Sequence, residues 1–425
     1  MLARTKPFFV AAERVLLWLE RRFASGSSRE GKLGLDVESS PVHGINVVGY
    51  LRAEVGIGEI ARRLVSAIEH QRIPCSTINY QRTASRQEFP FNEQAGHTAP
   101  YDTNLICVNP DQLPGFADAA GFAFFAARYT IGVWFWEVEI FPEQFHDAFD
   151  LVDEVWAASD FVRDALAAVT TKPVNVVPLP LEASRVEPIE RATLGLSDSF
   201  LFFYTFDFMS VAARKNPLGL VTAFKRAFEP GEGAALVIKS INGDRRPSEF
   251  ERLRLAAADH ADVHVIDGYL APNIKDGLMA ACDCYVSLHR SEGLGLTMAE
   301  AMSYARPVIA TGYSGNLTFM DDENSYLVPY TRAPVPPGCD PYPVGAVWAE
   351  PDLERAAALM RHVYENRAEA RKQGERGRRD IESRHSAART AGFIARRLDE
   401  IYDGPFFTGR PHVASQPVSS SALRR

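Results

Sequence analysis

The chain has 425 residues, of which 46% are hydrophobic and 24% are charged, so it holds ample material for hydrophobic cores and lacks the composition of a disordered protein. This length exceeds what one core usually supports and predicts two domains. The net charge of -8 argues against a general nucleic-acid binder, which normally has a basic surface.

The five cysteines are an odd number, too small for a disulfide framework in a chain this long, so we expect reduced thiols in a cytoplasmic protein. Cys282 and Cys284 have the spacing of residues on opposite faces of a strand. No second Cys/His cluster accompanies them, so no metal site is expected there. The sequence shows neither an apolar run long enough to cross a bilayer nor a signal-peptide cleavage site.

Residues 1–43 are predicted to form a segment outside the folded domains. Apolar residues recur at helical spacing from Phe8 to Phe23, and residues 1–34 contain seven Lys or Arg against three Glu. Such a basic amphipathic helix can lie on an anionic membrane surface, whereas a helix packed against its own domain is the favoured alternative. The stretch "SGSSREGKLG" that follows is typical of a flexible linker.

Residues 44–190 are predicted to form an N-terminal α/β domain. The strand "GINVVGYL" precedes the helix "RAEVGIGEIARRLVSAIEH", which is the start of a βαβ unit. Later strands are predicted at "TNLICVN", "YTIGVWFW", "EVWAAS" and "VNVVPLPL". Their apolar residues do not alternate with polar ones, which predicts strands covered on both faces and therefore a parallel sheet.

A second α/β series is predicted over residues 191–385, from the strand "FLFFYTF" to the strand "PVIATG". The amphipathic helix "SAARTAGFIARRLDEIYD" occupies residues 386–405, and residues 406–425 have the composition of a disordered tail. The fold class is therefore α/β, with two parallel sheets.

One candidate site lies in "HRSEGLGLTMAEAM", where a strand leads through a glycine turn into a helix. Ligands bind at such carboxyl ends of parallel strands, and a helix start with free amides favours an anion. Gly293 and Gly295 would let the anion approach the backbone. In the alternative reading, Thr297 and Glu300 form a capping box that needs no ligand. That reading leaves Glu292 unexplained, together with the neighbouring His289 and Arg290.

A second candidate site follows the strand "FLFFYTF", where Arg214 and Lys215 precede a helix that begins with Asn216 and Pro217. Two adjacent cations at the end of a strand suit a diphosphate, because Arg supplies a forked donor and Lys a point charge. A solvated pair in a loop is the alternative.

These motifs resemble a known family. The pattern "EGLGLTMAEAM", with glutamates separated by seven residues, is similar to the E-x7-E signature of the retaining glycosyltransferases of family 4, the glycosyl transferases group 1. The segments "DGYL" and "RPVIATGYSGNLTFM" resemble the same family in the same order, over about residues 200 to 330. In the N-terminal half, "GYLRAEVGIGEIARRL" and "GVWFWEVEIFPEQF" resemble a bacterial polysaccharide-type subgroup.

The resemblance implies the GT-B fold, in which two Rossmann-like domains face each other across a cleft and the last helix returns to the first domain. It implies that Arg214 and Lys215 neutralise the donor diphosphate, that Glu292 holds a hydroxyl of the transferred sugar, and that Glu300 binds the ribose hydroxyls. The other residues that it places around the donor are Gly56, Gly58, Glu59, Gly268, Tyr269, Leu270, His289, Arg290, Gly293, Gly295, Leu296 and Thr297.

The implied activity is retaining transfer of a hexose-type sugar from a nucleotide-diphosphate sugar to a saccharide or lipid-linked saccharide, in cell-surface polysaccharide synthesis such as that of exopolysaccharide or lipopolysaccharide. No D-x-D motif ends a strand, so we expect neither a metal nor another cofactor. Glu137 and Glu139 are expected on the acceptor side, or else as structural acids beside the tryptophans. A lipid-linked acceptor implies a peripheral contact with the inner membrane face.

Three other functions share parts of this sequence pattern. An NAD-dependent oxidoreductase is disfavoured, because Gly56-x-Gly58 lacks the third glycine of G-x-G-x-x-G and a following acid. A catalytically silent glycosyltransferase-like partner protein is disfavoured because both cations and both glutamates are present. A nucleotide-sugar hydrolase or epimerase of the same fold is the nearest enzymatic alternative.

Overall fold

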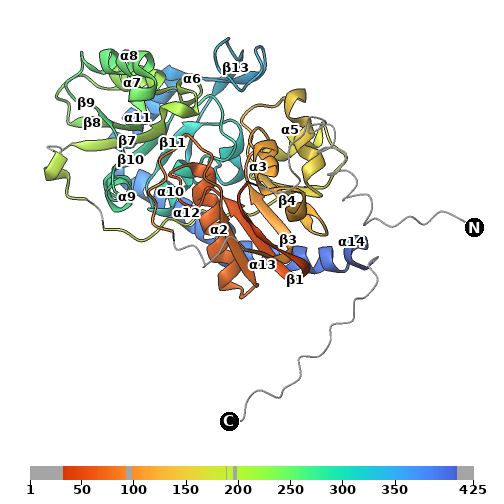
Figure 1. The fold of residues 1–425 in the computed structure, drawn as a ribbon. Coiled ribbons are helices and arrows are strands. Elements are labelled where there is room, and N and C mark those ends of the chain that lie inside the picture. The colour runs from red at the N-terminus through yellow and green to blue at the C-terminus, as the bar shows by residue number, and fades with distance from the viewer. Residues whose placement is uncertain (1–31, 92–97, 188, 195–198, 409–425) are drawn as a thin grey trace, which may run out of the picture.

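The computed structural model describes residues 32–91, 98–187, 189–194 and 199–408. The predicted N-terminal basic helix and the tail from residue 409 onward lie outside these residues. Figure 1 shows two α/β bodies, the first in red to yellow and the second in green to blue. Each body is built on its own six-stranded parallel sheet, which confirms the predicted fold class.

The N-terminal sheet has the strand order β2-β1-β3-β4-β5-β6. Its strands are β1 (Asp36–Gly49), β2 (Cys75–Asn79), β3 (Thr98–Cys107), β4 (Tyr129–Trp134), β5 (Glu154–Ala157) and β6 (Val174–Val176). The helices are α2 (Gly56–His70), α3 (Leu113–Ala120), α4 (Phe122–Phe125) and α5 (Asp160–Ala167), with the 3-10 helix η1 (Glu143–Leu151). Strand β1 starts inside the segment expected to be linker, and its residues are mostly exposed until the chain becomes buried at Gly44.

The C-terminal sheet has the order β12-β11-β10-β7-β8-β9. Its strands are β7 (Phe200–Asp207), β8 (Ala234–Ile241), β9 (Val263–Asp267), β10 (Cys284–Ser287), β11 (Val308–Thr311) and β12 (Tyr326–Val328). The helices are α6 (Ala212–Lys215), α7 (Pro217–Ala227), α8 (Pro247–Ala257), α9 (Pro272–Ala281), α10 (Leu296–Ser303), α11 (Leu353–Glu365) and α12 (Arg367–Arg384). Parallel pairing brings the carboxyl ends of these strands to one edge, where the predicted site residues lie.

The last helices, α13 (Ala387–Tyr402) and α14 (Pro405–Thr408), pack on the N-terminal domain, where α13 contacts α2 (Figure 1). A fully buried carboxylate anchors α13. Glu154 of β5 accepts hydrogen bonds from the Arg397 guanidinium at 2.5 Å and from the Tyr129 hydroxyl at 2.9 Å. The indole nitrogen of Trp156 donates to the same carboxylate at 2.5 Å. Every carboxylate of this kind needs such donors, because an unpaired buried charge is costly.

An antiparallel hairpin formed by β13 (Tyr330–Pro334) and β14 (Val347–Pro351) was not predicted from the sequence. The hairpin, together with its connecting segment, packs into the core of the N-terminal domain. The buried side chains that it contributes are Val335, Cys339, Tyr342, Ala346 and Trp348. The Tyr342 and Trp136 rings, for example, have centroids 5.5 Å apart. The hairpin therefore joins the two domains through apolar contacts.

The cysteines and the lengths of the helices bear on two further predictions from the sequence. All five cysteines are free, and four of them are buried. In the described part of the chain, no helix combines the length and the apolar character that crossing a membrane requires.

We expect Arg397→Ala to lower the free energy of unfolding by about 3 kcal/mol, because it removes the cation that compensates the buried Glu154 carboxylate. Chemical denaturation measures the change. The neighbouring Arg396 is exposed and serves as the control. Arg396→Ala should change stability by less than about 0.5 kcal/mol. Equal effects of the two substitutions would contradict this account of the α13 anchor.

Candidate active site

The cation pair lies in a single helical turn, α6, which is bounded by two residues with left-handed backbone conformation. Val211 has a φ of 61° and Asn216 a φ of 54°. The Asn216 side chain caps α7, accepting from the Gly219 amide at 3.2 Å. It also donates to the Leu288 carbonyl at 2.8 Å, which ties α6 to the end of β10. The sequence thus fixes Arg214 and Lys215 beside the glycine turn.

Arg214 and Lys215 both pair with Glu292. The Lys215 ammonium is 2.5 Å from one carboxylate oxygen, and the Arg214 guanidinium is 3.1 Å from the other. Arg214 also donates to the Ser291 carbonyl at 2.7 Å, and the Arg290 amide donates to the Arg214 carbonyl at 2.7 Å. The loops after β7 and β10 therefore converge, as the sequence predicted.

The electrostatics of this triad leave an excess positive charge. Burial raises the pKa of the Glu292 carboxyl, but the Lys215 and Arg214 charges outweigh burial and lower it to about 2. Glu292 is thus ionised at neutral pH and offsets one of two cations. The Nε of Arg214 is buried and has no hydrogen-bond partner among the described residues. The triad can accordingly attract an additional anion.

The glycine turn lies against the N-terminal domain. A Cβ atom at Gly293 would approach the Trp136 carbonyl oxygen to 3.1 Å, closer than most side chains allow. The Ser159 hydroxyl donates to the Gly293 carbonyl at 2.7 Å, and the Ser291 hydroxyl donates to the Glu137 carbonyl. A side chain at position 293 would therefore press on the N-terminal domain, so the contact between the domains favours glycine there.

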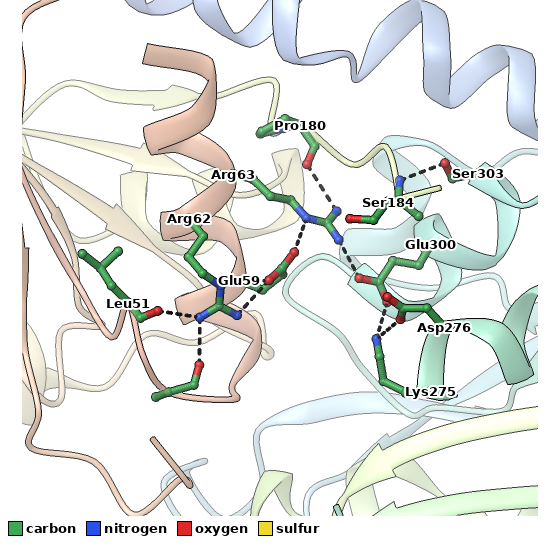
Figure 2. A network of polar contacts seen from close by, with 12 residues as sticks. Leu51, Glu59, Arg62, Arg63, Pro180, Ser184, Lys275, Asp276, Glu300 and Ser303 are labelled. Atoms are coloured by element: carbon green, nitrogen blue, oxygen red, sulfur yellow. Dashed lines mark hydrogen bonds and ion pairs between the residues drawn. The ribbon is translucent and has the colours of Figure 1, made fainter. Parts of the chain in front are cut away.

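The capping-box reading of Thr297 and Glu300 is wrong. Helix α10 begins after Gly295, which has a φ of 92°, and no side chain caps it. The Thr297 hydroxyl instead accepts from the Tyr285 hydroxyl at 2.8 Å. The Glu300 carboxylate points to two cations, as Figure 2 shows: it is 2.7 Å from Arg63 and 3.5 Å from Lys275.

Arg63 reaches Glu300 from the other domain. It belongs to α2, where Glu59 accepts from it at 2.7 Å and from Arg62 at 2.8 Å (Figure 2). Burial raises the pKa of the Glu59 carboxyl, but Arg63 and Arg62 lower it to about 2. The i,i+4 spacing of Glu59 and Arg63 was visible in the sequence. Nothing in the sequence indicated that Arg63 or Lys275 would contact Glu300.

The predicted glycine-containing loop of the N-terminal domain is the first turn of α2. Gly58 packs so closely on the preceding loop that a Cβ atom would lie 2.5 Å from the Tyr50 carbonyl oxygen. Gly56 has open space around it. Glu59 is held by the two arginines, so Gly56 is the member of this group whose surroundings are free.

A second arginine of the N-terminal domain, Arg86, packs on the ring of Tyr269. The Arg86 guanidinium lies 4.2 Å from the centre of the Tyr269 ring, and Glu54 pairs with Arg86 at 2.7 Å. The Tyr269 hydroxyl donates to Asn242 at 3.1 Å. Gly268, with a φ of 129°, makes the turn that presents this ring. Leu270 is half-buried against the core.

His289 and Arg290 do not present free groups to a donor. The buried His289 ring lies within hydrogen-bond distance of Ser287 and Asn316, each at 3.1 Å. Arg290 forms a two-pronged pair with Glu350 of β14, at 2.6 and 2.8 Å. These contacts hold the turn and the hairpin in place, and a contact of His289 or Arg290 with a donor stays a prediction.

Glu137 and Glu139 have different partners in the structure. Glu137 accepts from the Tyr342 hydroxyl at 3.0 Å, and the Tyr342 ring lies 5.9 Å from the Arg214 guanidinium. Glu139 pairs with the exposed Arg332 at 2.6 Å. Glu137 is therefore the one of the two that borders the cation pair.

Over residues 32–91, 98–187, 189–194 and 199–408, no group of three or more His, Cys, Asp or Glu side chains is arranged to hold a metal ion.

Known proteins resemble this chain in the sequence of the C-terminal domain and in fold. Residues 206–334 match the family model described as glycosyl transferases group 1. A search of curated proteins found no match. Anabaena HepE, solved with UDP and glucose, aligns with a TM-score of 0.60 at 15% identity, over 84% of this chain and 100% of that chain. The sucrose-phosphate synthase of Thermosynechococcus elongatus aligns with a TM-score of 0.60 at 14% identity, over 85% and 99%. A glycosyltransferase of Rickettsia africae aligns at 0.58 and 13%, over 85% and 99%.

The fold is GT-B, with two Rossmann-like domains. The matched segment contains Arg214, Lys215, Glu292 and Glu300, the residues that the structure gathers at the carboxyl ends of β7 and β10. The chain thus has the GT-B fold, and the segment 206–334 of its C-terminal domain matches the group 1 glycosyltransferase model.

Glu292 makes stability depend on pH. Because the pKa of its carboxyl is lowered from 4.5 to about 2, its stabilisation is fully present above pH 4.5 and is lost as the pH falls toward 2. The loss amounts to about 3 kcal/mol. We expect Glu292→Gln to be less stable than the wild type at pH 7 and to lose less stability between pH 5 and about pH 2. Urea denaturation along this pH series measures both slopes, and parallel slopes would refute the prediction.

Proposed function

We propose that the protein is a retaining glycosyltransferase that moves a hexose-type sugar from a nucleotide-diphosphate sugar to a saccharide or lipid-linked saccharide acceptor in cell-surface polysaccharide synthesis. The observation that carries the proposal is the convergence of Arg214 and Lys215 with Glu292 at the ends of β7 and β10. The family match over residues 206–334 covers this convergence.

The chemistry follows from charge. Cleavage of the bond between the sugar and the diphosphate leaves negative charge on the leaving phosphate and positive charge on the sugar carbon. Arg214 and Lys215 stabilise the leaving group, a preorganised electrostatic effect of several kcal/mol. The acceptor hydroxyl attacks from the face that the diphosphate leaves, and the departing phosphate takes its proton. This route retains the anomeric configuration and needs no enzymatic nucleophile.

The donor lies along the C-terminal domain in this proposal. Glu292 accepts from a hydroxyl of the transferred sugar, and Glu300 accepts from the ribose. The uncapped start of α10 supports a diphosphate or sugar contact at Leu296 and Thr297, because its first amides lack a side-chain partner. Gly56, at the start of α2, faces the donor phosphate from the N-terminal domain.

The same proposal assigns no metal to the reaction, because the two buried cations supply positive charge at the diphosphate. Glu137, beside the cation pair, takes the acceptor side. A cytoplasmic location with a peripheral contact at the inner membrane face suits a lipid-linked acceptor, and the basic residues of segment 1–43 would make that contact.

A thermal-shift screen against UDP-, GDP- and dTDP-sugars tests the donor class, since a true donor stabilises the folded state by mass action. Release of the nucleoside diphosphate is then measured with and without saccharide acceptors. Release that needs an acceptor supports transfer. Release into water identifies a hydrolase, conversion of the sugar identifies an epimerase, and binding without any turnover identifies a silent partner protein.

Lys215→Ala should lower turnover by about 100-fold or more, because it removes charge stabilisation from the leaving diphosphate. The measurement is the rate of nucleoside diphosphate release at saturating donor. Lys225→Ala removes a lysine of α7 that pairs with Asp259 on the surface, and it should leave the rate unchanged. If both variants keep the wild-type rate, the cation pair has no part in the chemistry.

Glu300→Gln should weaken binding of the nucleoside diphosphate by about tenfold, because hydrogen bonds to a charged acceptor are lost. Inorganic pyrophosphate, which lacks a ribose, should bind the variant and the wild type equally. Calorimetric titration of both ligands separates the two effects. A similar loss for pyrophosphate would show that Glu300 acts on the fold and not on the ribose.

A further inference from the structure

Lys239 is a largely buried cation on the C-terminal sheet. It lies in the carboxyl half of β8, in register with Thr205 of β7 and Ile266 of β9. Its relative exposure is 5%. Its ammonium forms no hydrogen bond or ion pair with any residue that the structure describes. A cation in a largely buried position without a protein partner calls for an explanation.

The carboxylates whose charge acts on Lys239 each bind another group: Asp267 accepts from the Ser240 hydroxyl at 2.7 Å, Asp207 from the Asn242 amide at 2.7 Å, and Glu54 pairs with Arg86 at 2.7 Å. These acids keep the ammonium charged without touching it. Burial lowers the pKa of Lys239 to about 8, and the nearby Lys275 contributes to this shift. At neutral pH most molecules therefore carry a charged, unpartnered Lys239.

The surroundings of Lys239 are those of the proposed nucleoside. Lys275, the cation that acts on it, lies 3.5 Å from Glu300, the proposed ribose contact. Asn242, which follows β8, accepts from the hydroxyl of Tyr269, which the family resemblance places at the border of the base. Lys239 thus borders both ends of the nucleoside.

The charges around Lys239 also determine which part of a nucleotide can bind there. Three carboxylates, Glu54, Asp207 and Asp267, would repel a diphosphate at this position. The diphosphate has its own cations in Arg214 and Lys215. A neutral carbonyl oxygen meets no such repulsion and accepts a hydrogen bond from an ammonium, which can only donate.

We propose that Lys239 determines base specificity by donating to the carbonyl oxygen that the donor base carries at C4 of a pyrimidine or at C6 of a purine. Uracil and guanine present a carbonyl where cytosine and adenine present an amino group, and an ammonium cannot accept from that amino group. This inference rests on the proposed function, and it restricts the donor to nucleotides whose base has a carbonyl at that position.

Calorimetric titration of UDP, CDP, GDP and ADP into wild-type protein and Lys239→Met tests it. The wild type should bind UDP more tightly than CDP, or GDP more tightly than ADP. Lys239→Met should weaken binding of the preferred nucleotide by about tenfold. It should leave the affinity for the matching nucleotide with an amino group, CDP or ADP, nearly unchanged. Lys225→Met is the matched control and should bind as the wild type does.

Two further measurements distinguish ligand binding from a role in folding. The wild-type affinity should fall as the pH rises through about 8, since the ammonium is lost, whereas Lys239→Arg should keep its affinity at pH 9. Without ligand, Lys239→Met should melt at a higher temperature, because it removes an unpartnered buried charge.

The outcomes are separable. If the wild type binds none of the four nucleotides and no dTDP, the proposed function fails. If it binds one of them and Lys239→Met binds that nucleotide equally well, the role of Lys239 alone is overturned. A lower melting temperature of Lys239→Met, with equal losses for all four nucleotides, also overturns it, since a folding role then explains the lysine.

Discussion

The pairing of Arg214 and Lys215 with one carboxylate, Glu292, is the interaction on which the rest of the site depends. Removing any of these charges from water is costly, and their short mutual distances repay that cost only in a fixed geometry. The geometry is fixed by backbone: Asn216 bonds to the Leu288 carbonyl, and the Arg290 amide bonds to the Arg214 carbonyl. Two loops from different strands thereby become one rigid unit.

The N-terminal domain contributes charge to this unit across the domain boundary. Arg63 contacts Glu300 and Arg86 covers Tyr269, and each arginine is held by a glutamate of its own domain. Glu300 is the proposed ribose contact, and Tyr269 is a residue that the family resemblance places around the donor. Binding of a donor would therefore be coupled to the contact between the domains, since the same groups serve both.

The sequence was sufficient to predict the two parallel sheets, because strands buried on both faces lack polar alternation. It also identified both cations and both glutamates, because they follow strands and lie near glycines. It could not show that Arg63 contacts Glu300, since the two residues are 237 positions apart in the chain. It could not show the protein partners of His289 and Arg290 either, because adjacency to the motif does not reveal where a side chain points. The hairpin was missed because its proline-rich connection has neither helical nor strand periodicity.

That hairpin has a mechanical consequence. Its apolar residues are embedded among the aromatic side chains of the N-terminal domain, whereas Arg63 and Arg86 hold the domains together through polar contacts. Water can replace a polar contact with little loss, but exposure of Trp348 and Tyr342 would cost several kcal/mol. A rotation of one domain relative to the other would therefore have its hinge at the hairpin. The contacts of Arg63 and Arg86 would separate the most.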